Sequence, residues 1–497
     1  IVFPTNLLEL RPGALTTFRG TLLNHAPVSG VIRTIDNSSQ GTLRVESNVV
    51  LSDDPSVAGH VRFLNGGLPA ATSISGVISD GAAPGGRTNF GRGTFSLTAD
   101  NTYSGVTQIG ENHPQVETII EISTDLAFGT SRIDFSGGEA LKTVRAAVGS
   151  GTRTLANNIR ISRSAEFTGS ESFVLNGAVY QSNGRELINR IDPGKSLTIN
   201  GNIYASDSMD VRDWIFEGYG LTIVNGIIDD SLGFPEVTGA SLIKRDNGRV
   251  IFTNPGVAAY GGQTTVNGGV LQLGNGGAAV GLNGNSVGGS AAGVLEINHS
   301  ELLLFDSAIG GNLAVNHTGS GTTVLAANSG GNGSINVQAG MIVVDGATGG
   351  GTLAVGPSAA IGGSGTIGGM VDVSGTMRPG ASIGVLTAQD AVFRDDAKLI
   401  IELGGIVPQV EYDRFVVNAT AQLGGELIVE LFDEFVPQSA ETFTIVSAGS
   451  LSGGFGNIAN GDRLDTFGGE GSFLVTYDGD TNAVVLSDFL LSAGPGL

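Results

Sequence analysis

Short runs of alternating apolar residues, separated by glycine- or asparagine-rich corners, recur along this chain and restrict what it can fold into. Four stretches show the pattern most clearly: Gly93 to Gly110, Gly248 to Gly274, Ile361 to Met370 and Gly375 to Leu386. Such a chain can coil with one strand on each side, because glycine adopts the positive φ angles that tight corners need. The pattern predicts a β-solenoid, which buries a long thin core and presents flat faces and two ends.

The expected core positions are clearest between Thr322 and Met377, where four-residue runs rich in β-branched residues are separated by glycine pairs. Within each run, two apolar residues sit two positions apart and therefore face the same side of a strand. The residues predicted to point into the core are Ile335/Val337, Ile342/Val344, Leu353/Val355 and Val371/Val373. The corners rarely carry the Asn-Gly or Asp-Gly pairs of tight hairpins, which favours a parallel β-helix with three strands per rung.

Changes of texture along the chain predict three regions. Residues 1–30 are expected to form an extended N-terminal arm, because Ile1 to Leu10 is apolar, contains proline and lacks glycine. Residues 31–390 are expected to form the solenoid, and motifs after Gly93 recur after Gly248 with an internal offset of about 150 residues. Residues 391–497 contain longer strands with more charges and aromatics, which predicts a β-rich C-terminal cap over an otherwise exposed end.

Composition limits the partners of the chain. Its net charge of −22 argues against binding to nucleic acid or to an anionic membrane. No apolar run approaches the roughly 18 residues that a membrane span requires. The chain begins Ile1-Val2-Phe3-Pro4, so we expect a secreted protein whose signal peptide has been removed. It contains no cysteine and therefore no disulfide. Without disulfides, such a protein depends on its backbone ladders and its core.

Two motifs resemble the autotransporter-associated β-strand repeat of bacterial surface and secreted proteins. Asn101 to Thr107 (NTYSGVT) is similar to the core of that repeat, and Gly363 to Gly369 followed by Gly375 to Ser382 resembles the run that closes many such passenger domains. The stretch from Leu399 to Val446 resembles the tail that follows it. The resemblance covers roughly Ser75 to the C-terminus and implies a solenoid at a bacterial cell surface, in a family that includes adhesins and matrix proteins.

One segment begins like a calcium-binding loop. Asp478, Asp480 and Asn482 have the early spacing of an EF-hand, but Ala483 and Phe489 stand where the glycine and the bidentate glutamate are needed. Two interpretations stay open, a turn between two strands and a weak calcium site. No other cofactor is expected.

Enzymatic activity is not expected from this sequence. The glycines from Gly363 to Gly368 match G-x-G-x-x-G, but a strand follows them where a dinucleotide site needs a helix. A polysaccharide-degrading β-helix enzyme needs carboxylates that converge on one face. The rungs with the clearest pattern, Thr322 to Met377, contain only Asp345 and Asp372 as carboxylates. Such an enzyme is kept as a distant alternative.

Both chain ends are apolar, Ile1-Val2-Phe3 at one and Phe489-Leu490-Leu491 at the other. A neighbouring copy could receive such an end as an added strand, and repeated head-to-tail contact of this kind generates an open polymer. A short basic stretch offers a second contact, either as solvated charges or as a patch that docks an acidic region of a neighbouring subunit. Its arginines are Arg145, Arg153, Arg160 and Arg163.

We therefore predict an extracellular structural protein whose subunits self-assemble into a filament, sheath or surface layer. The alternative is a monomeric adhesin that contacts host or matrix polymers, including cell-surface polysaccharide.

Overall fold

The computed structural model describes residues 7–9, 16–24, 32–37, 41–66, 70–113, 115–256, 258–282, 286–380, 383–408 and 410–492. The described residues form strands, turns and loops, and no helix capable of spanning a membrane is found among them. The chain divides into two compact units, an N-terminal unit of Ile1–Gln263 and a C-terminal unit of Thr264–Leu497.

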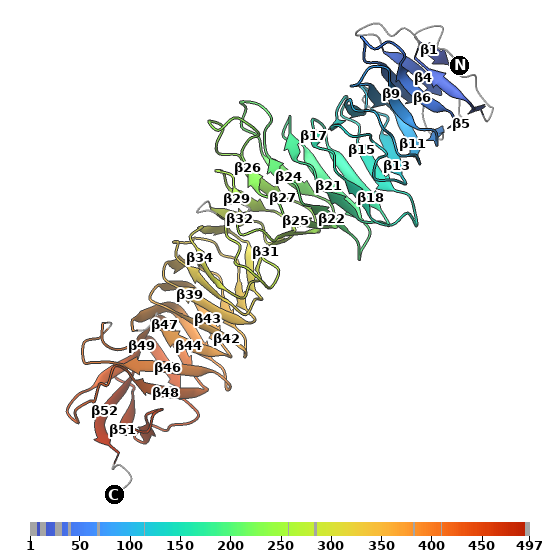
Figure 1. Ribbon diagram of the computed structural model, residues 1–497. Helices are drawn as coiled ribbons and strands as arrows, with labels where there is room; N and C mark the ends of the chain where they lie inside the picture. The colour runs from blue at the N-terminus through green and yellow to red at the C-terminus, as the bar shows by residue number, and fades with distance from the viewer. Residues whose placement is uncertain are drawn as a thin grey trace, which may run out of the picture. The chain divides into compact units, whose positions relative to one another are not determined.

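The N-terminal unit coils through three parallel sheets (Figure 1). Sheet I contains β1 (Leu7–Glu9), β4 (Arg33–Asn37), β7 (His60–Asn65), β10 (Arg87–Phe90), β12 (Thr107–Ile109), β14 (Ile133–Phe135), β17 (Ile159–Ile161), β20 (Val179–Gln181), β23 (Ile203–Tyr204), β26 (Ile228–Asp229) and β29 (Ala258–Ala259). Sheet II contains β2 (Thr16–Phe18), β5 (Thr42–Val45), β8 (Ala71–Ile74), β11 (Gly93–Leu97), β13 (Thr118–Ile122), β15 (Lys142–Ala146), β18 (Ala165–Gly169), β21 (Glu186–Ile191), β24 (Trp214–Glu217) and β27 (Leu242–Lys244).

Sheet III, the third side, is built in two runs of strands. The first run contains β3 (Thr21–Leu23), β6 (Asn48–Ser52) and β9 (Ile78–Gly81). The second run contains β16 (Arg153–Leu155), β19 (Phe173–Leu175), β22 (Ser196–Ile199), β25 (Leu221–Val224) and β28 (Arg249–Phe252).

The prediction of a parallel β-solenoid with three strands per rung is confirmed. The rung formed by β17, β18 and β19 is followed by β20, β21 and β22, which lie on it strand for strand. The registers join Ile159 to Val179 on sheet I, Ala165 to Leu187 on sheet II and Phe173 to Leu197 on sheet III.

The C-terminal unit has the same architecture, and its strands are grouped within the unit as sheets IV, V and VI. Sheet IV contains β30 (Thr264–Val266), β32 (Val287–Gly289) and β35 (Ile309–Gly311). Sheet V contains β31 (Gly269–Leu273), β33 (Gly293–Ile297), β36 (Ala314–His317), β38 (Ile335–Val337), β40 (Ala347–Thr348), β41 (Leu353–Val355), β43 (Thr366–Val373), β45 (Val385–Phe393), β47 (Arg414–Leu423), β49 (Phe443–Gly453), β50 (Arg463–Asp465), β51 (Gly471–Asp478) and β52 (Ala483–Leu491). Sheet VI contains β34 (Leu302–Phe305), β37 (Thr322–Leu325), β39 (Gly340–Val344), β42 (Ala359–Gly363), β44 (Thr376–Pro379), β46 (Lys398–Leu403) and β48 (Glu426–Leu431).

The interior is filled by the inward residues of each rung. All eight predicted core residues between Ile335 and Val373 are buried, as strand alternation requires. In the N-terminal unit the interior also contains aromatic stacks, such as Phe135, Phe167 and Phe173, whose ring centroids follow one another at 6.1 and 5.2 Å. The solenoid is therefore held by a continuous core in addition to its backbone ladders.

The structure places the expected regions differently in three respects. Strands β1, β2 and β3 pair with β4, β5 and β6, so the described parts of residues 1–30 form the first rung. The expected boundary at residue 391 falls inside β45, whose parallel pairing continues with β47. The motif after Gly93 lies on sheet II but its counterpart after Gly248 lies on sheet III, so the offset does not correspond to a module of whole rungs.

Candidate functional site

As far as the described residues go, the strands at the N-terminal edge of the solenoid have pairing partners on one side only. In the described part of the chain, β1, β2 and β3 each pair with one strand of the following rung. The backbone N–H of Glu46 donates to the carbonyl of Phe18 at 3.0 Å, which directs the backbone groups of Phe18 toward β5. Because successive residues of a strand direct these groups to opposite sides, the N–H and C=O of Thr17 face the open edge. Such an edge is a template for another strand.

The C-terminal end is closed by antiparallel strands. β49 is parallel to β47 but antiparallel to β52, and β51 is antiparallel to both β50 and β52. Phe489 is only 4% exposed, and its ring lies 4.8 Å from that of Phe473. Leu490 and Leu491 are 49% and 66% exposed. Of the apolar C-terminal residues, Phe489 therefore belongs to the interior of the cap, and its two neighbours remain at the surface.

The other apolar end, Ile1, Val2 and Phe3, lies outside the residues that the structure describes.

The four arginines of the basic stretch do not form one patch. Arg145 lies on sheet II, Arg153 on sheet III and Arg160 on sheet I, while Arg163 follows β17 at a corner. Each contacts a carboxylate of its own unit. The pairs are Arg145–Glu121 at 3.1 Å, Arg153–Asp125 at 3.5 Å, Arg160–Asp207 at 2.7 Å and Arg163–Glu139 at 3.4 Å. The corners of the coil thus carry residues that are neighbours in the sequence to different faces.

The calcium-like segment forms the turn between β51 and β52. The carboxylate of Asp478 accepts hydrogen bonds from the N–H of Asp480 at 2.9 Å and from the hydroxyl of Thr481 at 2.6 Å. These bonds lower the pKa of Asp478. Asn482 has a positive φ of 52° and accepts from the N–H of Leu451 at 3.3 Å. This arrangement fits the turn interpretation, and no group of three acidic or histidine side chains suited to a metal is found in the described ranges.

One carboxylate cluster escaped the sequence analysis. Glu402 and Glu430 lie in register on β46 and β48, and Arg378 contacts them at 3.5 and 3.4 Å. Burial raises the pKa of Glu402. Asp413 nearby is buried and accepts from the N–H groups of Gly384 and Glu402 at 3.0 and 2.9 Å, and burial raises its pKa to about 7. Arg378, which contacts both glutamates, and the backbone hydrogen bonds to Asp413 hold the strands of neighbouring rungs together.

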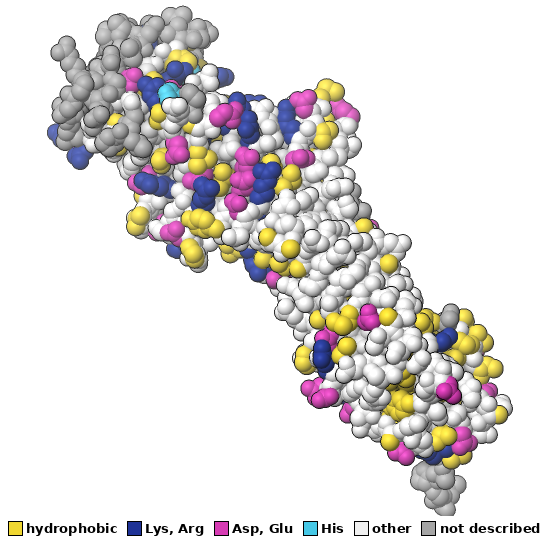
Figure 2. Space-filling view, turned by 180° about the vertical axis from the view of Figure 1, so that it is seen from behind, with side chains coloured by type: hydrophobic (Ala, Val, Ile, Leu, Met, Phe, Trp, Pro, Cys, Tyr) yellow, Lys and Arg dark blue, Asp and Glu magenta, His cyan; other side chains and the backbone are white. Residues whose placement is uncertain are grey.

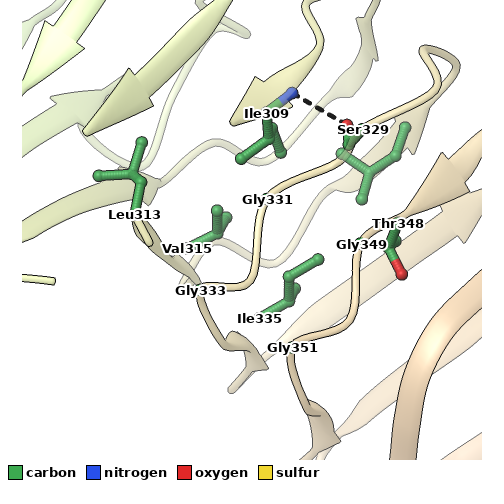
Figure 3. Close-up of a pocket in the computed structure, with 11 residues that line it drawn as sticks. Ile309, Leu313, Val315, Ser329, Gly331, Gly333, Ile335, Thr348, Gly349 and Gly351 are labelled. Atoms are coloured by element: carbon green, nitrogen blue, oxygen red, sulfur yellow. Dashed lines mark hydrogen bonds between the residues drawn. The ribbon is translucent and has the colours of Figure 1, made fainter. Parts of the chain in front are cut away.

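A small cavity lies in the interior of the C-terminal unit, among Ile309, Leu313, Val315 and Ile335 (Figure 3). Glycines of successive rungs, Gly331, Gly333, Gly349 and Gly351, form its other wall. Its volume is about 10 Å³, room for a single water molecule at most. We interpret it as a packing feature of the core.

Charge is distributed unevenly along the chain. No lysine or arginine occurs between Arg249 and Arg378. Figure 2 shows the result on one face: basic and acidic side chains alternate over the N-terminal unit, and a nearly uncharged stretch precedes the cap.

The described strands define the class of protein: a parallel β-solenoid with a one-sided first rung and an antiparallel C-terminal closure. No family model matches the chain, and no curated protein matches it.

Proposed function

We propose that the protein is an extracellular structural protein, a β-solenoid subunit that associates with further copies into a filament, sheath or surface layer. The observation that carries this proposal is the difference between its two ends. The first rung has strands with one partner each among the described residues, whereas the last rungs are closed by β51 and β52. A rung with unpaired backbone groups at its edge can pair with a strand from another chain, whereas a rung covered by antiparallel strands cannot.

Addition of a strand from a second copy would extend the ladders of the first rung by the same backbone hydrogen bonds that join its own rungs. The proposed donors are the apolar chain ends, Ile1-Val2-Phe3 and the exposed Leu490 and Leu491. Leu490 and Leu491 pair with Ser472 and Gly471 of β51 in their own copy, so they would have to leave this pairing to join a second copy. An end-to-end contact that does not close on itself produces an open polymer.

The stretch between Arg249 and Arg378 has no lysine or arginine and only five acidic residues, which supports a structural role. Its faces carry mostly glycine, alanine, serine, threonine and asparagine, and Asn336 donates to Asn316 at 2.9 Å across neighbouring strands. Copies can approach one another along such faces, because charged side chains are few there. This would allow lateral packing in a sheath or layer.

The edge contact is tested with Thr17→Pro. Proline removes an N–H that faces the open edge, keeps the bond from Glu46 to Phe18, and is tolerated on edge strands. Thr17→Ser is the matched control. We expect long regular assemblies by negative-stain imaging for the wild type and for Thr17→Ser, and folded monomers by size-exclusion chromatography for Thr17→Pro. A wild type that stays monomeric at high concentration would refute the assembly proposal, and polymerisation of Thr17→Pro would refute the role of this edge.

The extracellular location is supported by the resemblance to bacterial surface and secreted proteins. It is tested by adding protease to intact cells, which should remove the protein if it lies on the outside.

The monomeric adhesin remains the alternative. It predicts a single species by size-exclusion chromatography and binding to matrix polymers that survives the Thr17→Pro substitution.

A further inference from the structure

The outer face of sheet I carries polar and aromatic side chains in register, one from each rung. The row consists of Arg62, Asn89, Gln108, Asp134, Arg160, Tyr180 and Tyr204. Because neighbouring strands lie about 4.8 Å apart, the row repeats at roughly the length of one sugar unit in an extended polysaccharide. Asn89, Asp134 and Tyr180 are buried, so a polymer that runs along the solenoid axis would meet mainly the half-buried members of the row, Arg62, Gln108, Arg160 and Tyr204.

A second outward row lies beside the first. His60 and Arg87 are register partners on β7 and β10, and Arg132 directly precedes β14. Between the two rows the surface is hollowed by a groove of about 210 Å³, lined by His60, Arg87, Gln108, Arg132, Ser136 and Arg160 among others. Asp134 also lines the groove, which therefore combines cationic groups and one carboxylate with neutral hydrogen-bonding groups.

The cations of this face differ in how they are compensated. Arg132 contacts Asp134 at 2.9 Å, and Arg160 contacts Asp207 at 2.7 Å and Ser182 at 2.7 Å. Their guanidinium groups are thereby fixed in place.

Arg62 and Arg87 have no carboxylate partner among the described residues, although the protein as a whole has a net charge of −22. Burial and the charges of Arg62 and Arg87 lower the pKa of His60 to about 4. Arg87, which lines the groove, and Arg62, which lies outside its lining, thus place positive charge beside an imidazole that is neutral at neutral pH.

Two tyrosines continue the first row beyond Arg160. Tyr180 is buried. Its register partner Tyr204 is half-buried, and the Tyr204 hydroxyl lies 3.4 Å from Nδ2 of Asn202. Amphipathic rings of this kind pair an apolar surface with a polar tip, which suits contact with the faces and hydroxyls of sugars.

We propose that this face of sheet I binds an acidic polysaccharide, with the glycan along the row and its anionic groups at Arg62 and Arg87. We choose a glycan over a nucleic acid because the row repeats at roughly the length of one sugar unit. Asp134 and Asp207 are paired with Arg132 and Arg160 and would repel either kind of anion alike. The anionic group can be a uronate carboxylate or a sulfate ester. This binding does not depend on self-assembly, so it can be tested on the monomeric Thr17→Pro protein as well as on the wild type.

Isothermal titration calorimetry with defined oligosaccharides tests the proposal. The probes are oligogalacturonate and oligoalginate for carboxylates, a heparin oligosaccharide for sulfates, neutral dextran, and single-stranded DNA of matched charge. We expect binding to at least one acidic glycan that weakens as salt increases, and none to dextran. The carboxylate and sulfate probes then assign the anionic group. Equal binding to DNA, or no preference for acidic glycans over dextran, would overturn the proposal.

The site itself is tested with Arg87→Gln. Arg87 is exposed, so its replacement should leave the fold intact. Loss of a charged hydrogen bond should weaken binding about tenfold. Arg44→Gln is the matched control, because Arg44 is an exposed strand residue of sheet II and the change in net charge is the same. Equal affinities of the two variants would show that the groove is not the binding site. Tyr204→Ala should weaken binding to oligosaccharide with a smaller change in its salt dependence, and an unchanged affinity would remove the tyrosines from the site.

Discussion

The N-terminal unit and the stretch from Thr264 to Met377 build the same three-sided coil from different residues. In the N-terminal unit, aromatic rings stack in the interior and ion pairs join neighbouring strands on the outside, as Glu121 and Arg145 do on β13 and β15. The later stretch has no lysine or arginine, and its interior is mostly aliphatic. The same coil therefore forms with aromatic rings and ion pairs in one region and with small and aliphatic residues in the other. We infer that the register of the strands is set differently in the two regions.

Close backbone packing sets the register in the later stretch. Gly333, Gly351 and Gly369 lie one above another on successive rungs, and a methyl group on each would come within 1.9 to 2.2 Å of a carbonyl oxygen of the rung before. Only a residue without a side chain permits this approach. Where side chains are large, paired side chains align the rungs, and where they are small, contact between backbones does so.

The largest effect is expected from the aromatic interior of the N-terminal unit. Phe167 is fully buried and packs on Phe135 and Phe173, so Phe167→Ala should lower the free energy of unfolding by about 4 kcal/mol through lost burial and a cavity. Urea denaturation measures this. Tyr219→Ala, at a largely exposed position of the same unit, is the control and should change stability by less than about 0.5 kcal/mol. Similar losses in the two variants would show that the stack does not support the coil.

The glycine column should give the next largest effect. The added methyl of Gly351→Ala would lie 2.1 Å from the carbonyl oxygen of Gly333, and separation of the rungs should cost about 3 kcal/mol. Gly330→Ala is the matched control, since a methyl there meets nothing within 4 Å. We expect a lower unfolding midpoint for Gly351→Ala only. Equal midpoints would mean that backbone contact does not set the register.

These two regions also differ in how well the sequence predicts them. The core residues between Ile335 and Val373 were predictable, because alternation within a strand is local and survives any arrangement of the rungs. The arginines from Arg145 to Arg163 were not, because each corner turns the chain to another sheet. Neighbours in the sequence therefore face different directions.

The polar row of sheet I was missed for a related reason. One rung runs from Ile159 to Val179 and another from Ile228 to Ala258, so rung length varies and no fixed spacing marks residues of one row. The partnership of His60 with Arg87 depends on the length of the intervening loops. Strand patterns in the sequence do not reveal how long each loop is. They therefore cannot predict which residues of different rungs become neighbours.

Two buried histidines should make the C-terminal unit lose stability in acid, against an opposite contribution from Asp413, whose raised pKa favours the folded state as pH falls below about 7. His299 and His317 lie with ring centroids 5.6 Å apart, His299 contacts Thr323 at 2.8 Å, and Nε2 of His317 is buried without a hydrogen-bond partner. Burial lowers the pKa of both rings. The unfolded chain takes up protons below about pH 6.5, whereas the folded chain resists them. The contribution of these two histidines to the free energy of unfolding is thus fully present above about pH 6.5 and is lost as pH falls below it.

Urea denaturation between pH 7.5 and 5 measures this loss. As pH falls from 7.5 to 5, the double variant His299→Gln, His317→Leu should lose less of its free energy of unfolding than the wild type does. His113→Gln, in the N-terminal unit, should keep the wild-type dependence of the C-terminal unit. If the double variant also kept it, the buried pair would not be the source.

The smallest effect is expected for side-chain contacts between neighbouring strands on the outer faces, which are ion pairs in one region and amide hydrogen bonds in the other. Arg145 and Glu121 are partly exposed, so a double-mutant cycle with Arg145→Gln and Glu121→Gln should give a coupling of about 0.5 kcal/mol that falls at 1 M salt. Asn336 and Asn316 make the equivalent contact in the stretch without lysine or arginine, at 2.9 Å. A cycle with Asn336→Ala and Asn316→Ala should give a coupling that salt leaves unchanged, because neither amide carries a charge. Equal salt dependence in both cycles would mean that the ion pairs of the N-terminal unit do not align its rungs by electrostatic attraction.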